Sequence, residues 1–167
     1  MRRMIFALSA VLTLAVAAVA QLPSVELKDL EGKSVNTAEL NNEGKPFIIS
    51  FFATWCKPCL RELKAINEVY ADWQDETGVK LVAISIDEGQ NTERVKPLVA
   101  GLGWNYEVLL DSNSDFKRAM NVNLIPAVFV IDGSGKVYYS HSGYTEGSEE
   151  ELIVKVRELL AAESENK

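Results

Sequence analysis

Cysteine and histidine are scarce in this sequence, with two cysteines and one histidine among 167 residues. Two thiols and the single imidazole of His141 cannot complete a structural zinc site without carboxylates or a second subunit. The cysteines, Cys56 and Cys59, are separated by two residues, and a bridge across so short a loop restrains little entropy of the unfolded chain. A structural role for this pair is therefore disfavoured, and neither a metal nor another cofactor is expected.

Basic residues are also in deficit, with 17 lysines and arginines against 24 acidic residues and a net charge of −7. Phosphate binding needs a basic patch and none is visible, so the charge argues against nucleic acid as a partner. It argues equally against docking on an anionic membrane surface. With 47% hydrophobic and 25% charged residues, the composition is that of one ordinary globular domain.

A long apolar run occurs at the N-terminus. Arg2 and Arg3 precede an apolar stretch from Met4 to Ala20 that ends in Ala18-Val19-Ala20. A positive start, an apolar core and small residues before the cleavage point are typical of a secretory signal peptide. We therefore expect residues 1–20 to be a signal peptide and residues 21–167 to form one domain. An uncleaved membrane anchor is the alternative, but the stretch is short for a spanning helix.

Alternating strand and helix patterns follow residue 20. Turn signals and hydrophobic periodicity predict strands near 25–28, at Val35, and at 47–53, 80–86, 106–110, 127–131 and 136–140. Helical patterns are predicted at about 57–72, 91–101, 115–120 and 149–162. This alternation predicts a partly parallel sheet with right-handed crossovers, and the closing hairpin adds antiparallel strands. The predicted class is α/β.

The stretch Trp55-Cys56-Lys57-Pro58-Cys59 lies between a buried strand pattern and an amphipathic helix. Cys56 falls at the helix N-cap, where backbone N–H groups and the helix dipole favour a thiolate, so it is the expected attacking thiol. Cys59 lies one turn inside the helix and is the expected resolving thiol. Pro58 suits the first helical turn. Lys57 either adds positive charge beside the thiolate or is an ordinary surface lysine.

The segment Phe51–Cys59 resembles the active-site segment of the thioredoxin superfamily. The signal sequence, the Leu60-Arg61-Glu62 that follows Cys59, and Gly143-Tyr144 before the last helix resemble the TlpA/ResA-type branch of exported thiol–disulfide oxidoreductases. The match covers essentially residues 24–162. It implies a thioredoxin-like fold: a central mixed β-sheet flanked by helices, with an N-terminal β-hairpin and an inserted αβ element.

The resemblance also implies a surface that holds the partner peptide. The family has a cis-proline facing the dithiol, and Ile125-Pro126 before the strand at 127–131 matches it. Together with Trp55, these residues are the expected substrate contacts. From the residues alone, Pro126 could equally be a trans-proline at the start of a strand, and Trp55 could be ordinary core filling.

Glu62 lies three residues after Cys59, on the same helix face, and resembles the ResA-type carboxylate below the dithiol. Buried there, it would move protons to and from the resolving thiol; the alternative is an exposed helical glutamate. Ser50 departs from the thioredoxin pattern, which has a buried aspartate six residues before the first cysteine. Serine cannot act as a general base at neutral pH, so this departure favours Glu62 as the group that moves the proton. His141 is interpreted as an ordinary surface or half-buried histidine.

The leading hypothesis is a monomeric periplasmic thiol–disulfide oxidoreductase that reduces disulfides of exported client proteins. The family implies re-reduction by a membrane thiol reductant. One alternative is a peroxiredoxin-like peroxidase, but Ala53 stands where that chemistry wants threonine, three residues before the cysteine. Another is a metal-binding metallochaperone module that uses Cys56, Cys59 and His141. A non-catalytic interaction domain would keep working without its cysteines.

Overall fold

The computed structural model describes residues 21–165, so the predicted signal peptide at 1–20 lies outside the described residues. Seven strands form one sheet: β1 (Glu26–Asp29), β2 (Ser34–Asn36), β3 (Phe47–Phe52), β4 (Lys80–Ser85), β5 (Glu107–Leu110), β6 (Ala127–Ile131) and β7 (Val137–Ser142). The α-helices are α1 (Lys57–Thr77), α2 (Val95–Leu102), α3 (Asp115–Ala119) and α4 (Glu149–Glu165). Two 3-10 segments, η1 (Thr37–Glu39) and η2 (Gly89–Arg94), connect them. Within this range no helix is both long and apolar enough to cross a bilayer.

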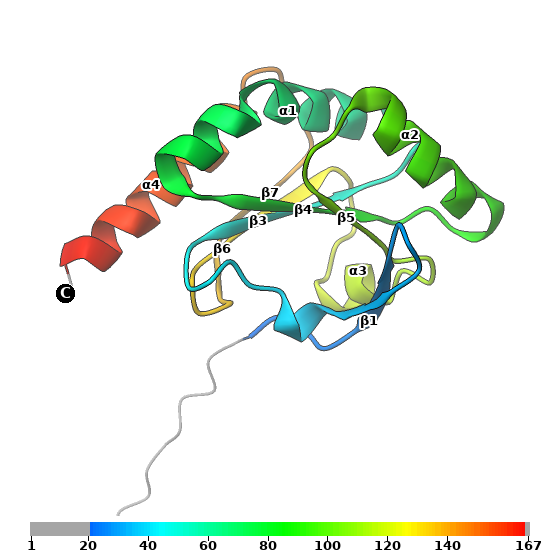
Figure 1. The fold of residues 1–167 in the computed structure, drawn as a ribbon, viewed down its shortest axis with the longest axis horizontal. Helices are drawn as coiled ribbons and strands as arrows, with labels where there is room; N and C mark the ends of the chain where they lie inside the picture. The colour runs from blue at the N-terminus through cyan, green and yellow to red at the C-terminus, as the bar shows by residue number, and fades with distance from the viewer. Residues whose placement is uncertain (1–20, 166–167) are drawn as a thin grey trace, which may run out of the picture.

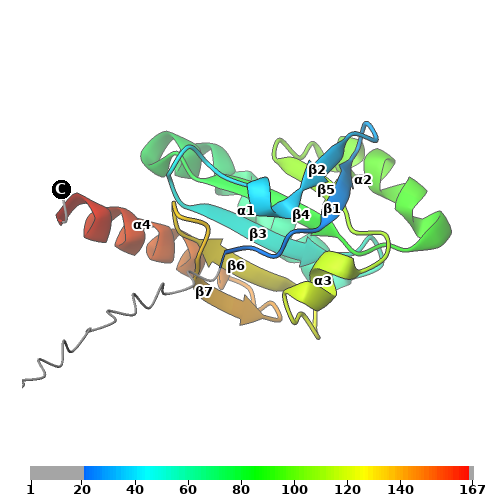
Figure 2. The same ribbon diagram turned by 90° about the horizontal axis from the view of Figure 1, so that it is seen from below.

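The sheet is mixed, with strand order β2-β1-β5-β4-β3-β6-β7. β4 runs parallel to both β3 and β5, as the helical crossovers require, whereas the hairpins β1–β2 and β6–β7 are antiparallel. Helices α1, α2 and α4 lie on one side of the sheet and α3 on the other (Figures 1 and 2). The predicted α/β class, with a mixed sheet flanked by helices and an N-terminal hairpin, is confirmed.

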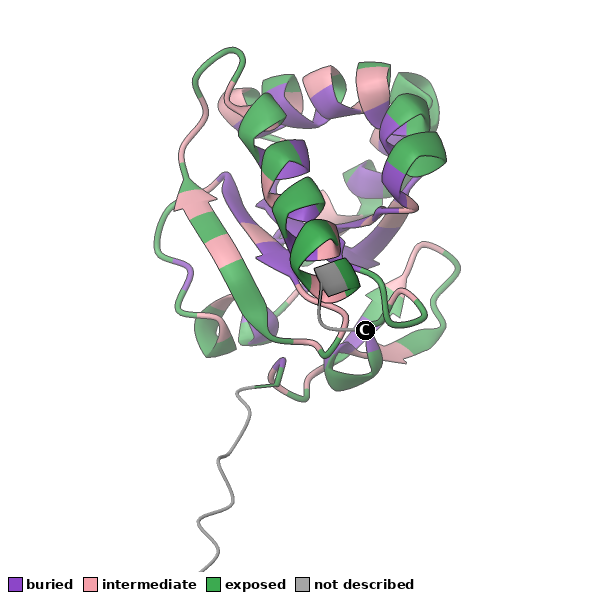
Figure 3. Ribbon diagram, turned by 90° about the vertical axis from the view of Figure 1, so that its left-hand side faces the viewer, coloured by how far each residue is buried: buried purple, intermediate pink, exposed green. Residues whose placement is uncertain are grey.

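Strand β3 runs through the centre of the core, and all six of its residues are buried. Phe51 packs against Phe116 of α3 and Phe129 of β6, at centroid distances of 5.4 and 5.9 Å. The helices turn buried faces towards the sheet and exposed faces outward (Figure 3). A strand buried on both faces reads as a continuous apolar run, which is why Phe47–Phe52 was recognisable from the sequence.

Helix α1 is longer than its periodicity indicated, since it ends at Thr77 rather than near Asp72. The extra turn is held by the buried Trp73 and by the Thr77 hydroxyl, which donates to the Trp73 carbonyl at 2.6 Å. Gly78 then ends the helix in the left-handed conformation at φ +68°, where glycine has no Cβ to clash. Strand β7 likewise extends beyond Ser140 to Ser142, which places His141 inside the sheet.

Candidate active site

Cys56 and Cys59 are joined in a disulfide where β3 passes into α1, with their Cα atoms 5.3 Å apart. Cys56 is the N-cap of α1, and its sulfur accepts the Cys59 N–H at 3.3 Å. Pro58 occupies the first turn of the helix. Cys56 is 6% exposed and Cys59 is fully buried, so the two sulfurs differ in their access to a partner.

The loop before Cys56 is held by Asp87, a buried carboxylate just beyond the end of β4. Asp87 accepts the Thr54 N–H at 2.8 Å and the Thr54 hydroxyl at 2.6 Å. The Ser85 hydroxyl donates to the same carboxylate at 2.9 Å. Because Thr54 is two residues before Cys56, these hydrogen bonds hold in place the loop that leads into Cys56. The sequence reasoning missed Asp87, although its place at the end of a parallel strand beside the dithiol loop was a usable signal.

Ile125 lines a cleft together with Cys56, and the residue that follows it, Pro126, is absent from that lining. The peptide bond between them is cis, and the Pro126 carbonyl accepts the Gly143 N–H at 2.8 Å. Pro126 is buried and Ile125 is half-buried. Ile125 and Trp55 line the same cleft as Cys56, and Trp55 is 62% exposed instead of filling the core.

Glu62 is fully buried on the inner face of α1. Its Oε1 lies 3.2 Å from Nε2 of His141, a side chain on β7 that is 17% exposed. Burial raises the pKa of the Glu62 carboxyl above its ordinary value, the contact with His141 acts in the opposite direction, and the charge of Glu149 on α4 adds to the rise. Among the described residues, Oε2 of Glu62 and Nδ1 of His141 have no hydrogen-bond partner. The two side chains therefore form a buried polar contact in which each keeps one polar atom without a partner among the described residues.

Ser50 lies in the same row of the sheet as His141. The register pairs Ser50 of β3 with Val128 of β6, and Val128 with His141 of β7. Directly paired residues point to the same face of a sheet, so Ser50 and His141 flank Val128 on the side where Glu62 descends from α1. Ser50 is fully buried, and its hydroxyl has no partner within residues 21–165. On this face of the sheet, the carboxyl group is that of Glu62 on α1, and its partner is His141 on the edge strand β7.

The predicted site residues fall into two groups around the disulfide. Towards solvent lie Trp55, Lys57, Pro58 and Ile125, which line the cleft with Cys56. Towards the core lies Glu62, on the helix face of Cys59. The prediction of an ordinary role for His141 missed its contact with Glu62, since the two residues are 79 positions apart. An imidazole on an inward-facing position of a strand was the one signal for it.

Comparison with known proteins identifies a family and a relative of this chain. Residues 19–140 match the model of the AhpC/TSA family. The thiol–disulfide oxidoreductase ResA of Bacillus thuringiensis (strain Al Hakam) is 34% identical over 117 residues, which is 70% of this chain and 65% of that protein. The chain therefore spans just under two thirds of the length of this relative.

Two solved structures share the fold. A thioredoxin-like protein of Porphyromonas gingivalis superposes with a TM-score of 0.76 at 74% identity, covering 85% of this chain and 93% of that one. A putative thiol:disulfide interchange protein DsbE of Chlorobium tepidum superposes with a TM-score of 0.73 at 25% identity, covering 84% and 95%. The thioredoxin-like fold expected from the sequence is thereby confirmed.

Proposed function

The chain belongs to the AhpC/TSA family, and we propose that it is a thiol–disulfide oxidoreductase that reduces disulfides of exported client proteins. The observation that carries the proposal is the Cys56–Cys59 disulfide at the start of α1, with the Cys56 sulfur on a backbone N–H of the first turn. Donors aimed at a sulfur stabilise it as a thiolate, which is the nucleophile in thiol–disulfide exchange.

In the proposed cycle, the Cys56 thiolate attacks one sulfur of the client disulfide and the other client sulfur leaves as a thiolate. Cys59 then attacks the Cys56 sulfur of the mixed disulfide, so that the Cys56–Cys59 bond forms and the client dithiol is released. Two electrons and two protons pass from protein to client. Cys56 suits the first step because it borders the cleft, and the buried Cys59 suits the second.

We propose that Glu62 accepts the proton that the resolving thiol of Cys59 must lose. Cys59 must lose a proton before it can attack, and a buried thiol needs a nearby base to take it. Glu62 lies one turn away on the same helix face, with a raised pKa and a free carboxylate oxygen within the described chain. His141 acts as a positioning residue, since its ring holds Glu62 at 3.2 Å.

The compartment, the oligomeric state and the electron donor are proposed as well. We place the protein in the periplasm, exported by a cleaved signal peptide at residues 1–20, as a monomer that a membrane thiol reductant re-reduces. Ile125, Pro126 and Trp55 would contact the client peptide. A peroxidase is disfavoured because Ala53 supplies no hydroxyl, and a metallochaperone because His141 engages Glu62.

The equilibrium potential of the Cys56–Cys59 couple tests the direction of the reaction. In defined thiol–disulfide buffers it should lie near that of thioredoxin, about −270 mV, because the protein is proposed to donate electrons. A value near the −120 mV or so of a strong oxidase would contradict the reductase assignment.

The roles of the two cysteines are tested with single variants and a disulfide-containing protein. Cys59→Ser should accumulate a mixed disulfide through Cys56, visible by mass spectrometry, because no resolving thiol remains. Cys56→Ser should form none. A mixed disulfide trapped through Cys59 in Cys56→Ser, with none in Cys59→Ser, would reverse the assignment.

A further inference from the structure

A cleft of about 520 Å³ opens beside the dithiol, between the start of α1 and the segment before β6. Two of its walls are large apolar side chains left in solvent, since Trp55 is 62% and Leu124 61% exposed. Large apolar side chains that are exposed together at one cleft mark an interaction surface, whereas single scattered ones do not. Ile86 and Ile125 add to the apolar lining.

The charged side chains that line this cleft are Lys57 and Lys117, and no carboxylate from the described residues joins them. Neither ammonium forms an ion pair within residues 21–165. This local positive charge stands out in a chain whose net charge is −7. Two unpaired ammonium groups over an apolar floor present a charge that a partner can complement.

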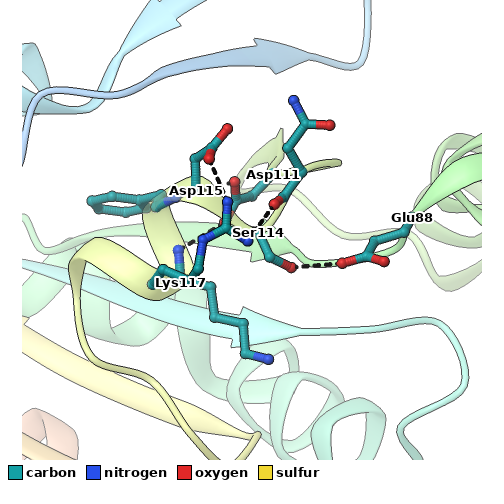
Figure 4. Close-up of polar contacts among 8 residues, drawn as sticks. Glu88, Asp111, Ser114, Asp115 and Lys117 are labelled. Atoms are coloured by element: carbon teal, nitrogen blue, oxygen red, sulfur yellow. Dashed lines mark hydrogen bonds and ion pairs between the residues drawn. The ribbon is translucent and has the colours of Figure 1, made fainter.

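The carboxylates nearest to Lys117 in the chain are already engaged (Figure 4). Asp111 accepts the backbone N–H groups of Phe116 and Lys117 at 3.2 and 2.8 Å. Asp115 pairs with Arg118. Figure 4 shows the Lys117 side chain extending away from Asp111 and Asp115. Its charge is therefore available to the cleft.

Two other carboxylates lie in this region. Asp87 is buried and already accepts hydrogen bonds from Thr54 and Ser85. Glu88 accepts the Ser114 hydroxyl at 3.0 Å (Figure 4). Both are absent from the cleft lining, so they leave the positive charge of the two lysines in place.

We propose that this cleft selects client disulfides whose flanking segment carries acidic side chains next to an apolar residue. The inference rests on the proposed reductase function and names its substrate class. The apolar residue would pack between Trp55 and Leu124, and the acidic groups would face Lys57 and Lys117. The chemistry is unchanged: the client S–S bond breaks, the Cys56–Cys59 bond forms, and the two electrons and two protons pass to the client.

The test uses the reduced protein and three synthetic disulfide peptides with one apolar core, flanked by glutamate, glutamine or lysine. The glutamate peptide should be reduced about five- to tenfold faster, in kcat/KM, than the lysine peptide, since two exposed ion pairs contribute a modest factor each. The difference should shrink in 0.5 M salt, where exposed charges are screened. Lys117→Glu should remove most of the difference between the glutamate and lysine peptides, because Lys57 then shares the cleft with a carboxylate of opposite charge.

Lys117 is the residue to change because Lys57 lies beside Cys56 and would alter its reactivity as well. Lys136→Glu is the matched control: it makes the same change in net charge in the β6–β7 turn, outside the cleft, and should preserve the wild-type difference. Equal rates for the three peptides would overturn the inference and leave the reductase function standing. Failure to reduce any peptide or a disulfide-containing protein would overturn both.

Discussion

Glu62 places a carboxyl group in the buried face of α1, between the dithiol segment and the edge strand β7. Its environment was open in the sequence, where the same spacing fits an exposed helical glutamate. In the structure the side chain is buried, and this desolvation raises the pKa of the Glu62 carboxyl above its ordinary value. Three predictions concern this residue and its partner.

Glu62→Gln should slow resolution of the mixed disulfide by roughly a hundredfold, the lower end of what general base catalysis supplies. The first step, attack by Cys56, should change little because Glu62 lies on the Cys59 side. Rapid-mixing kinetics that separate the two steps would measure this. Equal slowing of both steps would argue for a general structural effect.

Glu62→Gln should also change the way in which the free energy of unfolding depends on pH. Below the ordinary value of 4.5 the carboxyl is neutral in both folded and unfolded states, so its contribution to stability is fully present. That contribution is lost as pH rises through the raised folded-state pKa, because the folded protein must then release a proton it holds more tightly. The free energy of unfolding of Glu62→Gln minus that of the wild type should therefore increase from about pH 4.5 upward. Urea unfolding at a series of pH values measures it, and a flat difference would contradict the burial argument.

His141→Phe should remove the contact that opposes the rise in the pKa of Glu62. The pKa of Glu62 should then move further up, and the pH profile of mixed-disulfide resolution should move with it. Loss of a buried polar partner should also lower the free energy of unfolding by about 1–3 kcal/mol. His141→Gln is the control, because its amide can still donate to Glu62 and should restore much of the wild-type pH profile.

At the scale of elements, the site depends on the ends of two parallel strands. β3 delivers the loop that carries Cys56, and the end of β4 delivers Asp87, which holds Thr54 of that loop. Parallel neighbours bring their carboxyl ends to one edge of the sheet, which is why these segments meet although 33 positions separate them.

Asp87→Asn should lower the free energy of unfolding by about 1–3 kcal/mol, because an amide NH2 replaces one of two buried acceptor oxygens. It should also slow the attack by Cys56, since Thr54 loses its anchor. Urea unfolding and the rate of mixed-disulfide formation measure the two effects. Thr54→Ser, which keeps the hydroxyl and the N–H, should stay close to wild type. An unchanged attack rate in Asp87→Asn would remove the positioning role.

A close contact joins the loop before β3 to the turn after β6. A Cβ on Gly133 would come within 1.9 Å of the Gly44 carbonyl oxygen, a backbone atom that can move only with its loop. Gly133→Ala should therefore lower the free energy of unfolding by about 1–3 kcal/mol. Gly101→Ala is the matched control: it lies in α2 with open space around it and should stabilise by about 0.5–1 kcal/mol. Equal effects at the two glycines would contradict the contact.

At the scale of the whole molecule, the N-terminal segment sets the proposed compartment. Residues 1–20 carry Arg2 and Arg3 as their only charges, so the processed chain would carry 15 basic against 24 acidic residues. If the signal is cleaved as proposed, protein recovered from the periplasm should begin at Gln21, and intact-mass measurement would show it. Recovery of the full-length chain in the membrane fraction would favour the anchor instead.

Local features of the sequence predict the dithiol, its place at a helix start, the order of strands and helices, and the α/β class. These features follow from local patterns: hydrophobic periodicity, turn residues and the Cys-x-x-Cys spacing. The end of α1 was predicted too early, because its last turn is held by the buried Trp73 and the Thr77 hydroxyl, and the stop signal, Gly78, follows only after that turn.

Which distant side chains meet follows from the folded arrangement alone. The contact of Glu62 with His141 spans 79 positions, and Lys57 and Lys117 share a cleft from separate elements. Such contacts depend on strand register and on the packing of helices over the sheet, which no single segment encodes. The dithiol was readable from nine consecutive residues, whereas the buried contact of Glu62 with His141 and the cleft lined by two lysines exist only in the folded chain.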